Sequence, residues 1–284
     1  RRHTRLLTQS RGLGDVYKRQ GNIPHVLVSI KPVHSLVSNL LSGITKPELL
    51  LSGSETPHDH ALKPGQVARL ASADIIIWVG PSLESFLSRY LRRMGDQHVI
   101  TLVRDTDKHQ ANELHTDPHR WLNPELAFSD SRKIAYKIIE KYPHLERKIL
   151  DNLDQLYLRL QKLDNQLQKM FADNRHVSAV LYHDAWGYFT RRYRLTVDGI
   201  VNPQPHIQPG IRHLSQIQQT IKMKKTRCLL VEPQFKPGYL KSIASSSQQI
   251  KVLKIDPLGA NAPANRSTYF NLMLANAAVF AKCR

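Results

Sequence analysis

The chain has 284 residues, of which 41% are hydrophobic and 7% aromatic, enough for one large globular domain or two of about 100–150 residues. Its apolar runs are shorter than the roughly 18–20 residues of a membrane-spanning helix, which excludes direct membrane insertion. The formal net charge is +18. The basic residues are scattered and not interleaved with aromatic residues, so we expect no nucleic-acid partner.

The first twenty residues, RRHTRLLTQSRGLGDVYKRQ, resemble translated adapter sequence and show neither helix nor strand periodicity. They contain six Lys or Arg residues and one acid, which leaves 35 basic and 22 acidic side chains, or +13, in the remainder. We interpret residues 1–20 as a non-native tail and leave them out of the fold prediction. Because such a tail replaces the native start, the missing signal-peptide pattern is no argument for a cytoplasmic protein.

From residue 25 onward, apolar segments of strand length alternate with amphipathic helical segments. Strands are expected at 25–30, 48–51, 74–80 and 98–103, and helices at 32–42, 64–73 and 82–94. A polar loop then leads into a further helix, which Asn123 begins as N-cap and Pro124 as first residue. This alternation predicts a mostly parallel sheet covered by helices on both faces.

The second half repeats the pattern, with strands expected at 177–182, 195–201, 228–233 and 251–256, and helices at 211–223, 238–248 and 267–283. Between the halves, apolar residues recur every three or four positions from Leu145 to Met170. They predict one rigid amphipathic helix of about 28 residues, roughly 40 Å long. A coiled-coil dimer would also suit this narrow stripe, but the resumed strand–helix units favour packing on its own chain.

We therefore predict an α/β protein with an N-terminal lobe at 21–142, a linking helix at 143–174 and a C-terminal lobe at 175–284. Each lobe has a mostly parallel sheet flanked by helices, and the protein is expected to be a monomer. Ligands of such lobes bind at the carboxyl ends of the strands, so the interlobe cleft is the expected site.

Four residues that can bind a metal stand at strand ends or in adjoining loops: His58, His119, His183 and Asp256. The first three lie in PHDHALKP, DPHRWLNPE and YHDAWGYF, and the fourth ends the strand at 251–256. Three neutral imidazoles with one carboxylate or water suit tetrahedral Zn²⁺. The neighbouring Asp59 and Asp184 are candidates to orient the rings.

The segments PHDHALKPGQVARLASADIIIWVGPSLESF, DPHRWLNPE, YHDAWGYF, VEPQF and KIDPLGAN resemble, in order, those of ZnuA-type solute-binding proteins of bacterial zinc ABC importers. The resemblance covers residues 22–283. It implies two α/β lobes bridged by a rigid helix, and a cleft that holds Zn²⁺ as the transported ligand. It also implies delivery to a membrane permease and no catalysis.

On the resemblance, the histidine ligands are His58, His119 and His183, and Asp256 supplies or approaches the fourth position in some members. His60 stands where the family usually has tyrosine, which favours a role at the surface or beside the ligands. Pro57 replaces a glutamate that is an alternative fourth ligand in some relatives, which leaves Asp256 or water. Only a short loop, with His109 and His115, corresponds to the longer metal-collecting loop of zinc-specific members.

Spacing alone leaves Cys228 and Cys283 equally open to two buried thiols or one disulfide. The resemblance implies the disulfide, because zinc-importer members carry one at these places. A disulfide in turn implies an oxidising compartment, here the periplasm.

Three imidazoles favour zinc over manganese, which prefers more carboxylate oxygens. Binding should weaken in acid, because each imidazole must lose its proton first. The alternatives are a manganese or iron importer component, a metal-dependent adhesin of the same fold, and a zinc hydrolase. The hydrolase is disfavoured because the sequence has no HExxH or paired-metal motif. We expect the stiff helix to limit lobe closure, so that release depends on local loop movement.

Overall fold

The computed structural model describes residues 23–95, 97–104, 117–173, 175–203, 208–235, 238–245 and 249–284. The predictions for the tail at 1–20 and for the loop containing His109 and His115 lie outside these residues. Within them, no helix combines the length and apolar character needed to cross a bilayer.

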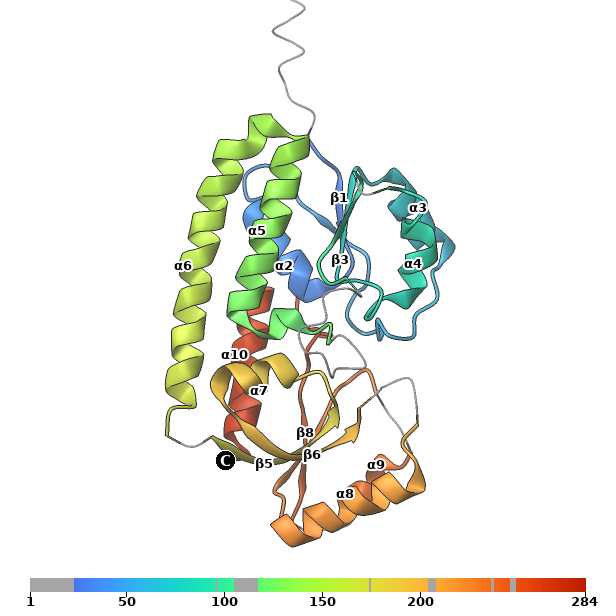
Figure 1. The fold of residues 1–284 in the computed structure, drawn as a ribbon, viewed down its shortest axis with the longest axis vertical. Coiled ribbons are helices and arrows are strands. Elements are labelled where there is room, and N and C mark those ends of the chain that lie inside the picture. The colour runs from blue at the N-terminus through green and yellow to red at the C-terminus, as the bar shows by residue number, and fades with distance from the viewer. Residues whose placement is uncertain are drawn as a thin grey trace, which may run out of the picture.

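The first lobe contains a parallel sheet of order β2-β1-β3-β4. Its strands are β1 (Val26–Val28), β2 (Glu48–Leu49), β3 (Ile75–Trp78) and β4 (Val99–Thr101). Helices α3 (Pro64–Ser72) and α4 (Ser85–Leu91) lie on one side, and α2 (Lys31–Leu40) and α5 (Pro124–Lys141) on the other (Figure 1). All four residues of β3 are buried, because helices cover both faces of this inner strand.

The second lobe repeats the same topology with the order β6-β5-β7-β8. Its strands are β5 (His176–His183), β6 (Thr196–Asn202), β7 (Cys228–Val231) and β8 (Lys251–Lys254). Its helices are α7 (Gly187–Tyr193), α8 (Ile211–Lys224), α9 (Leu240–Ala244) and α10 (Thr268–Ala281). In each sheet the strand order reverses beside the first strand, and such a reversal is the usual ligand position in open parallel sheets. The predicted fold class is confirmed.

The predicted long helix is α6 (Glu146–Met170), which follows a short 3₁₀ turn, Pro143–Leu145. It runs beside α5 along the edge of the molecule and ends near the second lobe (Figure 1). Its apolar stripe packs on helices of its own chain, chiefly α5, α2 and α10. The buried side chains of this stripe are Ile149, Leu153, Leu156, Leu160, Leu163 and Leu167. The stripe therefore belongs to the core of one chain, as predicted.

One hydrophobic core extends through both lobes. Val177, Ala179 and Leu181, on one face of β5, join the cluster that contains the core of the first lobe. Val180 and Tyr182, on the opposite face, belong to a separate cluster with residues of α8 and α9. Because residues of α6 and α10 belong to the larger cluster, the two lobes are held together by a shared hydrophobic core and not only by the connecting chain.

A buried lysine adds a polar connection between the lobes. Lys31, at the start of α2, is 5% exposed, and its Nζ donates to the carbonyl groups of Gly259 (2.7 Å), Ala260 (3.1 Å) and Ala262 (2.8 Å). These carbonyl groups lie in the loop that follows β8. The first lobe thus holds this loop of the second lobe in place.

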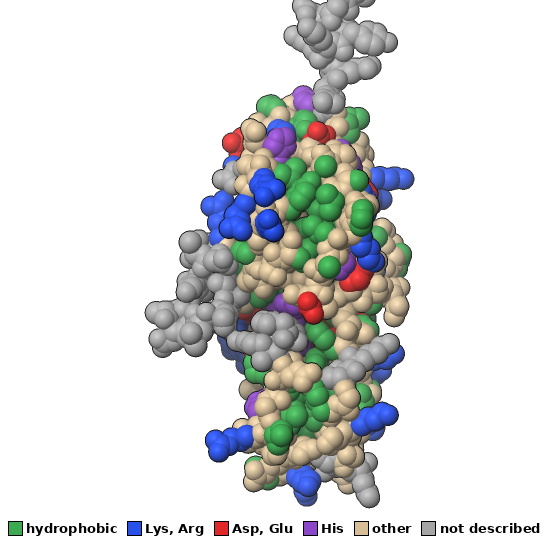
Figure 2. All heavy atoms as spheres, turned by 90° about the vertical axis from the view of Figure 1, so that its right-hand side faces the viewer, with side chains coloured by type: hydrophobic (Ala, Val, Ile, Leu, Met, Phe, Trp, Pro, Cys, Tyr) green, Lys and Arg blue, Asp and Glu red, His purple; other side chains and the backbone are tan. Residues whose placement is uncertain are grey.

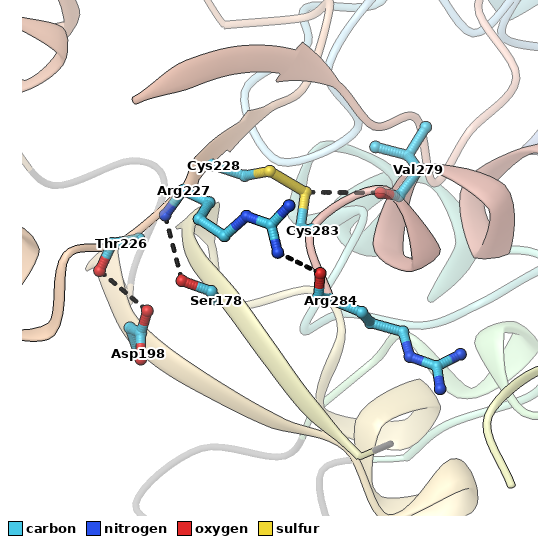
Figure 3. Close-up of a disulfide and its surroundings, with 8 residues drawn as sticks. All are labelled: Ser178, Asp198, Thr226, Arg227, Cys228, Val279, Cys283 and Arg284. Carbon is cyan, nitrogen blue, oxygen red and sulfur yellow. Dashed lines mark hydrogen bonds between the residues drawn. A yellow bond between two sulfur atoms is a disulfide. The ribbon is translucent and has the colours of Figure 1, made fainter. Parts of the chain in front are cut away.

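Cys228, at the start of β7, forms a disulfide with Cys283, just after α10 (Figure 3). The S–S distance is 2.08 Å, and both residues are buried. The carbonyl group of Cys283 also accepts a hydrogen bond from the N–H of Ser178 in β5 (2.8 Å). The C-terminal end is thereby fastened to the second sheet, and the disulfide implied by the resemblance is confirmed.

Candidate metal centre

His183 and Glu232 stand side by side at the carboxyl edge of the second sheet. His183 is the last residue of β5, and Glu232 directly follows the neighbouring strand β7. Both are 3% exposed, and Nδ1 of His183 lies 3.3 Å from each carboxylate oxygen of Glu232. The two residues therefore meet where the strand order of this sheet reverses.

His119 lies in the loop before the 3₁₀ turn Arg120–Leu122 and is 4% exposed. Its backbone N–H donates to Oδ1 of Asp117 (3.0 Å), and the same oxygen is 2.9 Å from its Nδ1. Oδ2 of Asp117 pairs with Arg191 of α7 at 3.5 Å. Because the carboxylate occupies Nδ1, Nε2 of His119 is left to face the cavity.

His58 is the third histidine and lies in the loop after β2, where it is half-buried. Its backbone N–H donates to the hydroxyl group of Thr56 at 3.3 Å. Of the three rings, it is therefore the one nearest to solvent.

The three rings converge from these separate segments. The ring centroids lie 5.6 Å apart for His58 and His119, 5.2 Å for His58 and His183, and 5.1 Å for His119 and His183. One ligand nitrogen from each lies within 4.8 Å of the others, close enough for one ion to bind all three. Among the described residues, this is the group of potential ligands that meets that criterion.

The walls of the cavity around the rings are mostly apolar. Its lining includes Pro57, Leu83, Trp121, Phe235, Pro257 and Leu258. The ring of Trp121 lies 5.3 Å from that of His119, and the ring of Phe235 5.6 Å from that of His183. Figure 2 shows histidine atoms at the surface between the two lobes. An apolar surround limits water at the site and restricts how the rings can turn.

Asp256 is not brought into the histidine group. Its Oδ1 accepts from the backbone N–H groups of Leu258 (3.0 Å) and Gly259 (2.9 Å). Its Oδ2 accepts from the N–H of Ala260 (2.6 Å), and the side chain of Gln234 donates to Oδ1 (3.3 Å). In this arrangement the carboxylate organises the loop after β8, the loop that Lys31 also holds.

The structure also places the three other residues that the sequence suggested beside the ligands, His60, Asp59 and Asp184. Nε2 of His60 lies 2.9 Å from the side-chain oxygen of Gln66, and its ring packs on Phe86. Asp59 and Asp184 are exposed. Asp184 directly follows β5, and its carboxylate lies close enough to His119 and His183 for electrostatic interaction with both rings.

The carboxylates that contact the rings are Asp117 and Glu232, which sequence reasoning did not select. The sequence held one usable signal for each. Asp117 lies two residues before His119, and Glu232 lies near the end of the strand predicted at 228–233, as His183 follows the strand predicted at 177–182.

A two-lobed α/β protein with a histidine cluster in its cleft and a long bridging helix is a metal-binding solute-binding protein by fold and site. The family described as zinc-uptake complex component A, periplasmic, matches residues 26–283, and the chain belongs to this family.

Individual relatives agree with this assignment. The high-affinity zinc uptake system protein ZnuA of Haemophilus ducreyi is 30% identical over 287 aligned residues, which cover 91% of this chain and 92% of that protein. A crystal structure of ZnuA is similar in fold, with a TM-score of 0.80 at 23% identity, and covers 92% of this chain and 99% of its own. The periplasmic zinc-binding protein TroA from Treponema pallidum has a TM-score of 0.81 at 19% identity, with coverage of 92% and 99%.

Proposed function

We propose that this protein captures Zn²⁺ in the periplasm with His58, His119 and His183 and delivers it to the membrane permease of a zinc ABC importer. The observation that carries the proposal is the convergence of three imidazoles, two of them buried, in a chain of the zinc-uptake family. Three nitrogen donors suit zinc better than manganese, which prefers oxygen ligands. The role is binding and transfer, not catalysis.

We assign the fourth coordination position to water and not to Asp256. To reach the ion, this carboxylate would have to give up three backbone N–H groups and the amide of Gln234. Each buried donor left without a partner costs about 1–3 kcal/mol. Water fills the position without that cost.

For release, the shared core makes a wide hinge movement of the lobes costly. Two of the ligands, His58 and His119, lie on loops, and His58 is the more exposed of the two. We propose that zinc leaves by movement of the loop that carries His58. Amide hydrogen exchange should then be slowed by zinc in this loop and little changed in α6.

The test is a competition titration of the metal-free protein against a zinc-chelating dye, with manganese as the rival ion. His58→Ala, His119→Ala and His183→Ala should each weaken zinc binding by roughly 100-fold or more, because two imidazoles cannot complete the site. His60→Ala is the matched control, since that ring is held by Gln66 outside the group. Asp256→Ala should weaken binding much less than any of the three.

The outcome decides between the candidate functions. Tight manganese binding with weak zinc binding would place the protein with manganese or iron importers. Equal zinc affinity in all four histidine variants would show that the cluster is not the binding site.

A further inference from the structure

Glu232 is a buried carboxylate that lies against one of the three histidines but outside the group that can bind the ion. We infer that Glu232 is a positioning residue of the zinc site. Its carboxylate holds the hydrogen of His183 on Nδ1, so that Nε2 faces the ion, and it supplies the negative charge that Asp256 does not. This inference rests on the proposed function and adds a residue to the same site.

The two strands that carry these residues determine the contact. In the parallel pair β5–β7, Leu181 is level with Leu230. Two residues further along, this register brings His183, the last residue of β5, beside Glu232, which directly follows β7. The carboxylate meets the Nδ1 side of the ring, with both oxygens at 3.3 Å. This contact is therefore built into the sheet and does not depend on a mobile surface side chain.

A carboxylate can only accept a hydrogen bond, so the ring nitrogen that faces it has to carry the hydrogen. With the hydrogen on Nδ1, the lone pair is on Nε2, which is the nitrogen left for the cavity. Histidine ligands in metal sites are commonly oriented by a carboxylate in this way. The neighbouring strand thus selects the tautomer that can bind an ion.

The charge of Glu232 lacks a cationic partner in the described part of the chain. Its only ion-pair contact there is with His183, and its Oε1 accepts no hydrogen bond from the described residues. Burying a carboxylate without a compensating charge is costly. A Zn²⁺ ion on the far side of the same ring would compensate this charge, which couples ion binding to Glu232.

Two further carboxylates near the site, Asp117 and Asp256, differ in this respect. Asp117 pairs with Arg191 in addition to His119. Asp256 accepts three backbone N–H groups, and the loop that it organises is held by Lys31. Their charges are already compensated by Arg191 or by backbone N–H groups, whereas the charge of Glu232 is left for a bound cation to compensate.

The experiment compares the wild-type chain with Glu232→Gln and Glu232→Ala. Asp59→Asn is the matched control, because it removes an exposed carboxylate that directly follows the ligand His58 in the sequence and does not line the cavity. Zinc affinity is measured by chelator competition. The hydrogen position on His183 is read from side-chain ¹⁵N shifts of the metal-free protein labelled at histidine.

We expect both Glu232 variants to lose roughly 10–100-fold in zinc affinity, the usual effect of removing a partner of a ligand histidine. Asp59→Asn should stay within about threefold of the wild type, since it leaves the carboxylate partner of His183 in place. In the spectra, His183 should carry its hydrogen on Nδ1 in the wild type and lose this preference in Glu232→Ala. A merely structural role for Glu232 would not move the tautomer.

Wild-type His183 with its hydrogen on Nε2, or a Glu232→Gln variant with unchanged affinity, would overturn the inference. If the variants fail to fold, the wild-type spectrum alone still decides the tautomer. Weak zinc binding by a folded wild type, with His183 hydrogenated on Nδ1, would count against the proposed function while supporting the role of Glu232 in positioning the ring.

Discussion

Glu84 is a fully buried carboxylate in the turn between β3 and α4, next to Leu83 of the metal cavity. Its Oε2 accepts the backbone N–H groups of Val79 (2.8 Å) and Gly80 (3.0 Å). Burial raises the pKa of Glu84 from 4.5 to about 7. Glu84→Gln removes the ionisable group and keeps an oxygen that can accept the two N–H groups.

The raised pKa means that the folded protein binds the proton of Glu84 more tightly than the unfolded chain does. Below pH 4.5 the carboxyl is protonated in both states, and its full contribution to stability is present. That contribution is lost as the pH rises through about 7, because the folded state must then bury a charge. One pKa unit corresponds to about 1.4 kcal/mol, so the loss between pH 5 and pH 8 is about 2–3 kcal/mol.

The assay is urea unfolding of the metal-free wild type and of Glu84→Gln at pH 5 and at pH 8. Groups that titrate in both proteins cancel in the comparison, histidines included. The free energy of unfolding of the wild type should fall by about 2–3 kcal/mol more than that of the variant between these two pH values. Parallel pH dependence in the two proteins would refute the reasoning.

Two further predictions concern contacts that hold the second lobe. Lys31→Met removes three hydrogen bonds donated by a buried ammonium group, and we expect the free energy of unfolding in urea titrations to fall by about 3 kcal/mol. A change below about 0.5 kcal/mol, the range of an ordinary surface substitution, would contradict this role. Cys283→Ser opens a disulfide whose cysteines are 55 residues apart, and the chain-entropy model gives a loss of roughly 4 kcal/mol. Adding a reductant to the wild type should lower its unfolding midpoint similarly and leave that of the variant unchanged.

Local sequence pattern determined most of the architecture. Apolar runs such as IIIW can only be covered on both faces, so alternation with amphipathic helices was enough to predict the sheets. The stripe from Leu145 to Met170 likewise predicted α6. The prediction missed α7, because GYFTRRY is too short for its periodicity to stand out against a loop.

The three histidines could be selected from the sequence because each follows a strand or lies in a loop, and parallel strands bring their carboxyl ends to one edge. The carboxylates that contact these histidines could not be selected from the sequence in the same way. Whether Asp256 faces an ion or its own loop depends on backbone N–H groups and on Lys31, which is more than 200 residues away in the chain. Glu232 meets His183 only through the pairing of β5 with β7, a long-range register that local pattern does not contain.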